Sequence, residues 1–284
     1  AHGARRKALI SVGGAGTLAA FRGAWSDAHR GAFVTAITRF AVDHGYDGVD
    51  IDVEPLEASD AVAFQRFVRT LRGALDGERA GMLLTAAAGD TPSAYVPIQS
   101  LFQQINVMTY DLSGPWPGWV TWHNTPLRNG GMRFPGTTEP MPSVETAVGA
   151  FLAAGVTAAR LGVGVDLYGY DWRGASGPLQ SIRGVTTRTL SYAAIMDTLW
   201  RPERARWDAT ASVPWIAIDN PGTADDHFIS YDDERSAAAK VDFARARGFG
   251  SVIVWELGGG WRASQPAGAR DLVLQAIGRA ATGG

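Results

Sequence analysis

The sequence has 284 residues, 46% of them hydrophobic and 19% charged, which is the composition of a globular protein with a core of its own. The formal net charge is −2 and no run of Lys and Arg builds a basic face, so no nucleic-acid partner is expected. The absence of Cys excludes disulfide bonds, Cys metal sites and thiol catalysis. No apolar stretch reaches the roughly 18 residues of a spanning helix, so no membrane association is expected.

Short apolar runs alternate with amphipathic stretches along the first half of the chain, which is typical of βα units around a parallel sheet. Strands are predicted at residues 8–12, 48–54, 82–88, 105–110 and 160–167, and helices at residues 27–43, 60–75, 98–103 and 144–154. A long loop rich in Pro, Gly and Trp is predicted at residues 111–142. Loops of that length are uncommon in compact domains and are usually functional.

The alternation stops after residue 169 and resumes at residue 234. A helical piece is predicted at residues 192–199, followed by short strand-like pieces at residues 215–218 and 227–231. A helix at 234–247, a strand at 251–257 and a last helix at 268–281 come next. The fold class is therefore α/β: a (β/α) TIM-type barrel with about six βα units, incomplete beside the eight of a closed barrel. Residues 1–169 and 234–284 would form the catalytic barrel domain, and residues 170–233 an α+β insertion before the last strand.

The segment from Asp47 to Pro55 carries most of its charge on one side of a predicted strand. Side chains on a strand alternate between faces, so Asp50, Asp52 and Glu54 share one face while three apolar residues share the other. Asp47 is an odd number of residues from Asp50, so it should face the other way and serve the structure. An exposed strand with one solvated face is the alternative, which the apolar neighbouring strands disfavour.

Three carboxyl groups at alternate positions have a chemical consequence. Residues two apart on a strand lie about 7 Å apart at Cα, and like charges at that distance do not all ionise easily. At least one carboxyl pKa should therefore rise, which suits a general acid. Glu54 lies at the carboxyl end of the strand, where the active sites of barrels form.

The pattern Asp47-Gly48-x-Asp50-x-Asp52-x-Glu54 resembles the signature strand of family 18 glycoside hydrolases, the chitinases and their relatives. Other segments resemble family motifs in the same order: Ser11-Val12-Gly13-Gly14, Met108-x-Tyr110-Asp111, His123-Asn124-x-Pro126-Leu127, Tyr168-Gly169, Ile229-Ser230-Tyr231-Asp232-Asp233 and Trp255. The resemblance covers nearly the whole chain. The family's barrel begins with two further βα units before the Ser-Val-Gly-Gly strand.

The resemblance implies roles for the catalytic candidates. Glu54 would act as general acid and then as general base. Asp52 would hold the substrate's acetamido group and stabilise a cyclic oxazolinium ion, while Asp50 shares a proton with it. Tyr110 would hydrogen-bond the same acetamido group, whose oxygen is the nucleophile in this family.

Five further residues are candidates for substrate binding. Trp255 would form the floor under the distorted sugar, and Asp111 would contact the sugar around the cleaved bond. The others are Met108, Tyr168 and Trp116. Trp116, Trp119 and Trp122 lie in the long loop, where Trp faces suit sugars, although anchoring of the loop is the alternative reading. Met108, Tyr110 and Trp255 could each simply fill a core, and Glu256 should point away from Trp255.

The function expected is that of a retaining glycoside hydrolase, a chitinase that cleaves β-1,4-linked N-acetylglucosamine polymers (chitin and chitooligosaccharides) by substrate-assisted catalysis. The alternatives are a non-catalytic, lectin-like chitooligosaccharide-binding protein and an endo-N-acetylglucosaminidase acting on glycoprotein glycans. No cofactor is expected. No catalytic metal is expected either, because the five His are scattered along the chain. The resemblance implies a secreted, extracellular protein. A homodimer could cover the open edge of the barrel.

Overall fold

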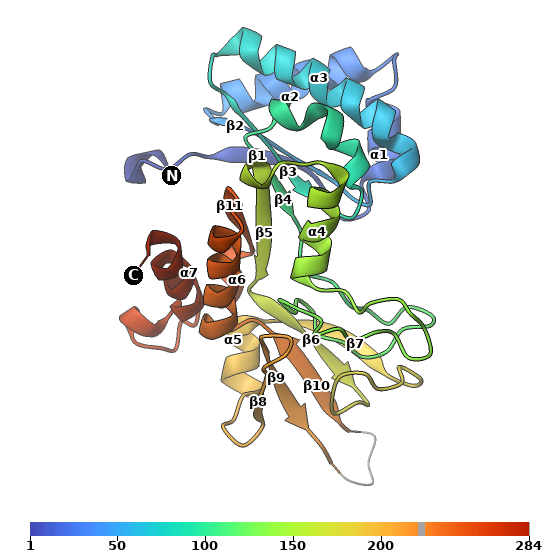
Figure 1. The fold of residues 1–284 in the computed structure, drawn as a ribbon. Helices are drawn as coiled ribbons and strands as arrows, with labels where there is room; N and C mark the ends of the chain where they lie inside the picture. The colour runs from blue at the N-terminus through green and yellow to red at the C-terminus, as the bar shows by residue number, and fades with distance from the viewer. Residues whose placement is uncertain (221–224, 284) are drawn as a thin grey trace. The chain divides into compact units, whose positions relative to one another are not determined.

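The computed structural model describes residues 1–220 and 225–283 (Figure 1), so residues 221–224 of the predicted insertion and Gly284 lie outside the described residues. The chain forms two compact units. The first unit consists of Ala1–Met108, Gly149–Gly162 and Phe249–Ser251, and the second of Thr109–Val148, Val163–Gly248 and Val252–Gly284. No helix among the described residues is both long and apolar enough to cross a membrane.

One sheet of six strands has the order β1-β2-β3-β4-β5-β11, and its first three neighbouring pairs are parallel. The strands are β1 (Leu9–Gly14), β2 (Gly48–Val53), β3 (Leu83–Ala88), β4 (Gln104–Val107), β5 (Leu161–Asp166) and β11 (Ser251–Trp255). The predicted partial (β/α) barrel with six strands is therefore confirmed. β4 ends three residues earlier than predicted, so Met108 and Tyr110 follow the strand and are not part of it.

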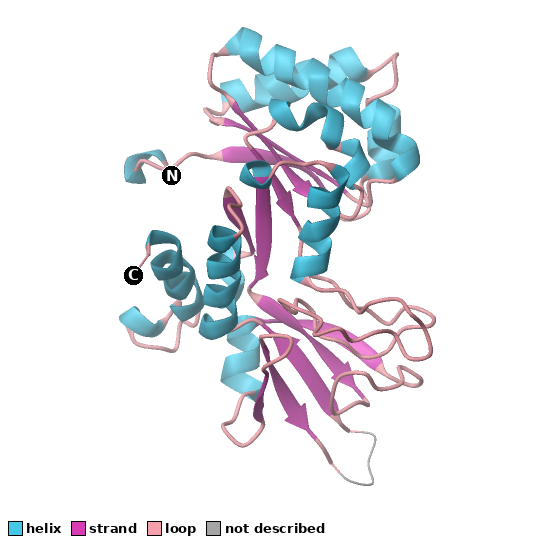
Figure 2. Ribbon diagram, in the orientation of Figure 1, coloured by secondary structure: helices cyan, strands magenta, loops and turns pink. Residues whose placement is uncertain are grey.

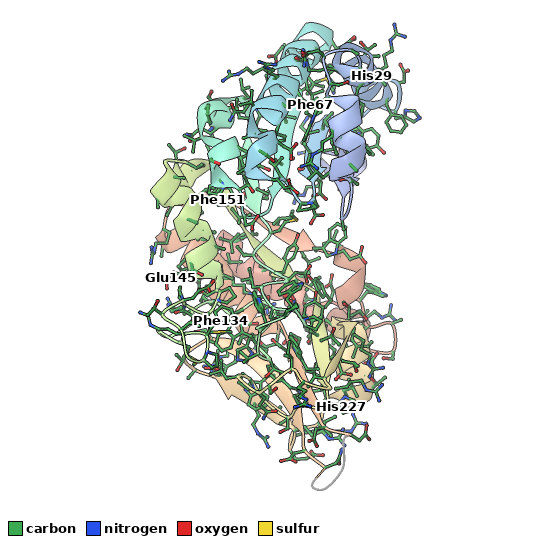
Figure 3. All side chains as sticks on the ribbon, turned by 90° about the vertical axis from the view of Figure 1, so that its right-hand side faces the viewer. His29, Phe67, Phe134, Glu145, Phe151 and His227 are labelled. Carbon is green, nitrogen blue, oxygen red and sulfur yellow. The ribbon has the colours of Figure 1, made fainter. Side chains whose placement is uncertain are left out.

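Three α-helices of the first unit cover its strands, as Figure 2 shows by the cyan layer above the magenta strands. They are α1 (Leu18–Ala24), α2 (Arg30–Asp43) and α3 (Ala61–Glu78). Phe64, Phe67, Val68 and Leu71 were predicted on one face of α3, and all four are fully buried. Phe67, labelled in Figure 3, stacks on Phe33 of α2 with ring centroids 5.4 Å apart. The short helix α1 was not predicted.

The second unit contains an antiparallel sheet of five strands in the order β7-β6-β10-β9-β8. Its strands are β6 (Tyr168–Arg173), β7 (Thr186–Ser191), β8 (Ala205–Asp208), β9 (Val213–Ile218) and β10 (His227–Tyr231). The sequence predicted β9 and β10 and missed the other three. The helices of this unit are α5 (Tyr192–Ala194), a π-helical turn (Ile195–Leu199), α6 (Glu234–Ala246) and α7 (Leu272–Thr282).

Helix α4 (Val144–Ala154) has the bounds that the sequence predicted. The remaining elements are short 3-10 helices: His2–Ala4, Ala58–Asp60, Pro92–Ala94, Val96–Leu101, Ala158–Arg160, Leu257–Gly260 and Ala267–Ala269. One of these, Val96–Leu101, stands where the sequence predicted a helix at residues 98–103.

The core of the second unit includes buried charges. Lys240 of α6 is fully buried, forms an ion pair with Asp232 and donates to Thr125 Oγ1 at 2.5 Å. Asp166 at the end of β5 is also fully buried and accepts a hydrogen bond from Asn124 Nδ2 at 2.5 Å. Burial, and then the neighbouring Asp232, raise the pKa of Asp166 well above its ordinary value. Because each charge is paired or hydrogen-bonded, the interior tolerates them.

Candidate active site

The acidic strand β2 is held by hydrogen bonds from both neighbouring strands. In the parallel register, Ser11 of β1 and Thr85 of β3 lie opposite Asp50. The Ser11 hydroxyl donates to Asp50 Oδ2 at 3.0 Å, and the Thr85 hydroxyl donates to Oδ1 at 2.5 Å. Burial raises the pKa of Asp50, and these two hydrogen bonds oppose the rise. Asp50 is thus a fixed carboxyl group, the first in the row of acids Asp50, Asp52 and Glu54, which we call the acidic row.

The next acid, Asp52, is a carboxyl group poised near neutral pH. Its exposed fraction is 9%, and its Oδ1 has no hydrogen-bond partner within the part of the chain that the structure describes. Burial first, and then the charges of Glu54 and Asp50, raise its pKa from 3.8 to about 7. A hydrogen bond with Glu54 adds to the rise. The predicted electrostatic coupling within the acidic row is therefore present.

The opposite face of β2 packs into the unit. Val49, Ile51 and Val53 are at most 2% exposed, as the alternation predicted. Gly13 of β1 allows the close approach of β2, because a Cβ at its φ of +133° would lie 1.7 Å from the backbone oxygen of Asp52. The backbone of the acidic residue is therefore fixed by its neighbour strand.

Asp47 has the structural place that was predicted for it. It accepts hydrogen bonds from the Ala8 backbone N–H at 2.9 Å, from Lys7 Nζ at 3.0 Å and from His2 at 2.8 Å. The Ala8 hydrogen bond, followed by those of the two side chains, lowers the pKa of this carboxyl group. Asp47 thus fixes the segment that leads into β1.

Tyr95 is a residue near the acids that the sequence analysis missed. Its side chain is buried, and its ring lies 5.2 Å from that of Phe64 and 5.9 Å from that of Phe151, which Figure 3 labels. Burial raises the pKa of Tyr95, and the charges of Asp50 and Asp52 raise it further. Nothing in its local sequence distinguishes it from an ordinary core Tyr.

The second unit contains a cavity of about 300 Å³ whose lining includes Asp111, Tyr168 and Trp255. The structure thus brings together three of the predicted substrate-binding residues, which are far apart in the sequence. Tyr170 and Glu256 line the same cavity. Tyr170 was not predicted at all.

Glu256 was expected to point away from Trp255, on the assumption that the strand continues to residue 257. β11 ends at Trp255, so the alternation on which this expectation rests does not extend to Glu256, and both residues line the cavity. Trp255 is 52% exposed, which makes its indole face available to a ligand and removes the reading of this residue as core.

Asp111 is oriented from several directions. Its backbone has a φ of 55°, and its N–H donates to Asn124 Oδ1 at 3.1 Å. The hydroxyl groups of Tyr168 and Tyr170 donate to its Oδ1 at 2.6 and 2.9 Å. Burial raises the pKa of each Tyr, and the charge of Asp111 contributes to both rises. Both phenols therefore stay protonated and act as donors.

The remaining predicted residues lie outside this cavity lining. Tyr110 is 7% exposed, and its ring stands edge-on to that of Tyr168 at 6.1 Å. Met108 belongs to the first unit, is half-buried and donates its N–H to the Ala88 oxygen at 2.9 Å. Trp116 is 45% exposed and packs edge-on against Trp119 at 4.5 Å.

Trp122 anchors the long loop, which corrects the reading of all three loop Trp as ligand-facing. It is fully buried, its indole N–H donates to the Pro142 oxygen at 2.9 Å, and it packs with Phe134 and Met141. Figure 3 labels Phe134 within this loop. Among the described residues, no group of three or more His, Cys, Asp or Glu could hold a metal ion.

The chain thus combines a partial (β/α) barrel that has an acidic strand with a cavity whose lining includes Trp255, Tyr168 and Tyr170. The chain matches the family "Glycosyl hydrolases family 18" over residues 2–260, and it belongs to this family. It is 29% identical to "Chitinase A1" of Niallia circulans over 89% of its own length and 40% of that protein's length. It is 30% identical to "Probable endochitinase" of Caenorhabditis elegans over 88% of its own length and 43% of that protein's. The chain thus spans less than half of these relatives.

Solved structures share the fold. The Group IV chitinase of Ostrinia furnacalis superposes with a TM-score of 0.85 at 21% identity, over 99% of this chain and 81% of that one. Human YKL-39, described as a pseudo-chitinase with retained chitooligosaccharide binding properties, superposes with a TM-score of 0.82 at 20% identity, over 100% of this chain and 82% of that one. The fold therefore occurs both in enzymes and in proteins described as pseudo-enzymes.

Proposed function

We propose that this protein is a retaining chitinase that hydrolyses β-1,4-linked N-acetylglucosamine chains by substrate-assisted catalysis. The observation that carries the proposal is the row Asp50, Asp52 and Glu54, in which the first two acids lie on one face of β2 and Glu54 follows its last residue, Val53, with the pKa of Asp52 raised to about 7 by burial and by the other two acids. A row of this kind can store and release a proton near neutral pH, as glycosidic cleavage requires.

The proposed mechanism gives each acid one task. Glu54 protonates the leaving glycosidic oxygen and later takes a proton from water. The substrate's acetamido oxygen attacks the anomeric carbon, so configuration is retained. Asp52 accepts the acetamido N–H and stabilises the positive charge of the oxazolinium ion, while Asp50 exchanges a proton with it. Tyr110 is proposed as a second hydrogen-bond donor to the acetamido group.

The cavity of the second unit supports the proposal that the ligand is a carbohydrate. The exposed indole of Trp255 offers an apolar face that suits the C–H face of a pyranose ring. Asp111 offers a carboxylate acceptor in the same lining, and the Tyr168 hydroxyl donates to it at 2.6 Å. Relatives that carry the names chitinase and endochitinase support chitin as the polymer. Met108 and Trp116 remain proposed contacts of the substrate.

The test is Glu54→Gln, assayed on a chitooligosaccharide. Loss of a general acid should lower kcat by about 10²- to 10⁴-fold with little change in ligand affinity. Glu78→Gln is the matched control, because Glu78 is an exposed carboxylate at the end of α3 in the same unit. Unchanged turnover in the Glu54 variant would show that another group donates the proton.

A non-catalytic lectin-like protein is the second candidate, and the likeness in fold to a pseudo-chitinase favours it. Turnover and binding should be measured on the same preparation. Tight binding of a chitooligosaccharide with no product at high protein concentration would replace the hydrolase proposal with this one.

Two features of the whole protein are proposed with the activity. An extracellular location suits an enzyme whose polymeric substrate is too large to enter a cell. A homodimer would cover β1, the first strand in the order of the six-stranded sheet, because exposed edges favour association. Light scattering behind a sizing column measures the mass, and a monomer at all concentrations would remove the dimer proposal.

A further inference from the structure

One ladder of the antiparallel sheet supplies much of the cavity wall. In the β6–β7 pair, Tyr168 lies opposite Ser191 and Tyr170 lies opposite Thr189. All four side chains line the cavity. Side chains two apart on a strand share a face, so the sheet presents this set together. The position of Tyr170 is therefore set by the same rigid ladder that sets Tyr168.

The two phenols converge on a single oxygen atom. Tyr168 and Tyr170 both donate to Asp111 Oδ1, at 2.6 and 2.9 Å. A carboxylate oxygen has about two lone-pair sites, so two donors occupy it fully. Within the described residues no hydrogen bond reaches Oδ2 of Asp111. Asp111 thus has one oxygen occupied by the protein and one left for a ligand.

A hydrogen bond from only one Tyr would fix the orientation of the Asp111 carboxylate less firmly. The backbone of Asp111 lies in the left-handed region at a φ of 55°, and its N–H donates to Asn124 Oδ1. Rotation about χ2 would exchange the two carboxylate oxygens, since this torsion is broad and roughly two-fold. Two donors from fixed positions on β6 keep Oδ1 turned to the sheet and Oδ2 turned away from it.

We propose that Tyr170 is a positioning residue for substrate binding, which acts by sharing Oδ1 of Asp111 with Tyr168 and so presents Oδ2 as the acceptor for a sugar hydroxyl group. The inference rests on the proposed function and adds a residue to it. An acceptor held in this way selects ligands that carry a free hydroxyl donor at that position. A sugar unit whose hydroxyl is methylated loses the contact.

The experiment compares Tyr170→Phe with Tyr192→Phe. Tyr192 is the matched control, because its hydroxyl also donates to a carboxylate of the second unit, Glu234 Oε1 at 3.1 Å, outside the cavity lining. The kinetics of a chitooligosaccharide are measured for both variants, and its affinity is measured by calorimetry in the Glu54→Gln background. Tyr170→Phe should raise KM and weaken binding about tenfold, while kcat stays within about twofold. Tyr192→Phe should leave all three unchanged.

A double-mutant cycle with Asp111→Ala separates positioning from a general structural role. Once Asp111 is truncated, Tyr170→Phe should have no further effect on KM or on affinity. An additive effect in the cycle, or an unchanged KM in the single variant, would overturn the inference and leave the hydrolase proposal standing. A wild-type protein that binds a chitooligosaccharide without turnover would refute the hydrolase proposal. The affinities measured by calorimetry for the variants would still decide the role of Tyr170.

Discussion

Thr85 Oγ1 donates to Asp50 Oδ1 at 2.5 Å, and this hydrogen bond joins β3 to the first acid of β2. It favours the ionised form of Asp50 and so lowers the pKa of that carboxyl group. Thr85→Val keeps the shape of the side chain and removes the donor. The pKa of Asp50 should then rise, which the pH titration of its carboxyl ¹³C signal would measure.

The control for this substitution is Thr70→Val. The Thr70 hydroxyl donates to the Arg66 oxygen on an exposed turn of α3, where no carboxyl group of the acidic row takes part. If the proton of Asp50 passes to Asp52 during catalysis, the acid limb of the activity profile should move to higher pH in the Thr85 variant alone. If the acid limb of the pH–activity profile does not shift in the Thr85 variant, Asp50 takes no part in proton transfer during catalysis.

Asp52 should make the folded state less stable at alkaline pH. A carboxyl group whose pKa rises from 3.8 to about 7 on folding binds more protons in the folded state between these values. The free energy of unfolding therefore falls as the pH rises through that window. Asp52→Asn should be more stable than the wild type at pH 8 by roughly 2 kcal/mol, after allowance for solvent screening, and equal to it near pH 3.

Urea unfolding at several pH values measures this difference. Asp43→Asn, at an exposed position at the end of α2, is the control and should change stability little at any pH. A stability gap for Asp52→Asn that does not depend on pH would mean that the carboxyl group is not desolvated on folding.

Trp255→Ala should weaken the binding of a chitooligosaccharide by about ten- to a hundredfold, because an exposed indole face in the cavity lining would be lost. Trp261→Ala is a stringent control. Trp261 is 50% exposed, nearly the same as Trp255, and it does not line the cavity. Equal losses in the two variants would assign the effect to surface Trp in general.

Lys240→Met should cost about 3–5 kcal/mol of stability, because the buried Asp232 would lose its counter-charge. The comparison is Arg30→Met, which removes a surface ion pair with Asp27 and should cost less than about 1 kcal/mol. Thermal unfolding followed by circular dichroism distinguishes the two. A small effect for Lys240 would indicate that Asp232 takes up a proton when unpaired.

The sequence predicted best where one face of an element is regular. β2 alternates acids with Val49, Ile51 and Val53, and α3 places apolar residues at helical spacing, so both were found with nearly correct bounds. The strand β6 carries its aromatic residues on one face and Gly169, Asp171 and Arg173 on the other. Since Asp171 is buried and polar, the strand does not show the apolar buried face that marks a strand in the sequence, and the sheet to which it belongs was predicted only in part.

The sequence was enough to predict which residues belong to the candidate site. It was not enough to predict which of them contact one another. Asp50 and Asp52 lie two apart on β2 and Glu54 follows directly after it, so local spacing alone was enough to pick out the three acids. The contact between Asp111 and Tyr170 joins residues 59 positions apart, and only the folded chain brings them together. A contact of this kind is not encoded in any local period, which explains why Tyr170 was missed.

The position of β1 at the end of the strand order has a measurable signature in its backbone. In a parallel pair only every other residue directs its N–H and C=O toward the neighbour, so amides of β1 that face β2 are shielded while the intervening ones point to the other side. Hydrogen–deuterium exchange should therefore give a two-residue rhythm of slow and fast amides from Leu9 to Gly14. Any chain that docks along this strand would slow the fast set and erase the rhythm, which makes these few amides an internal reporter of assembly.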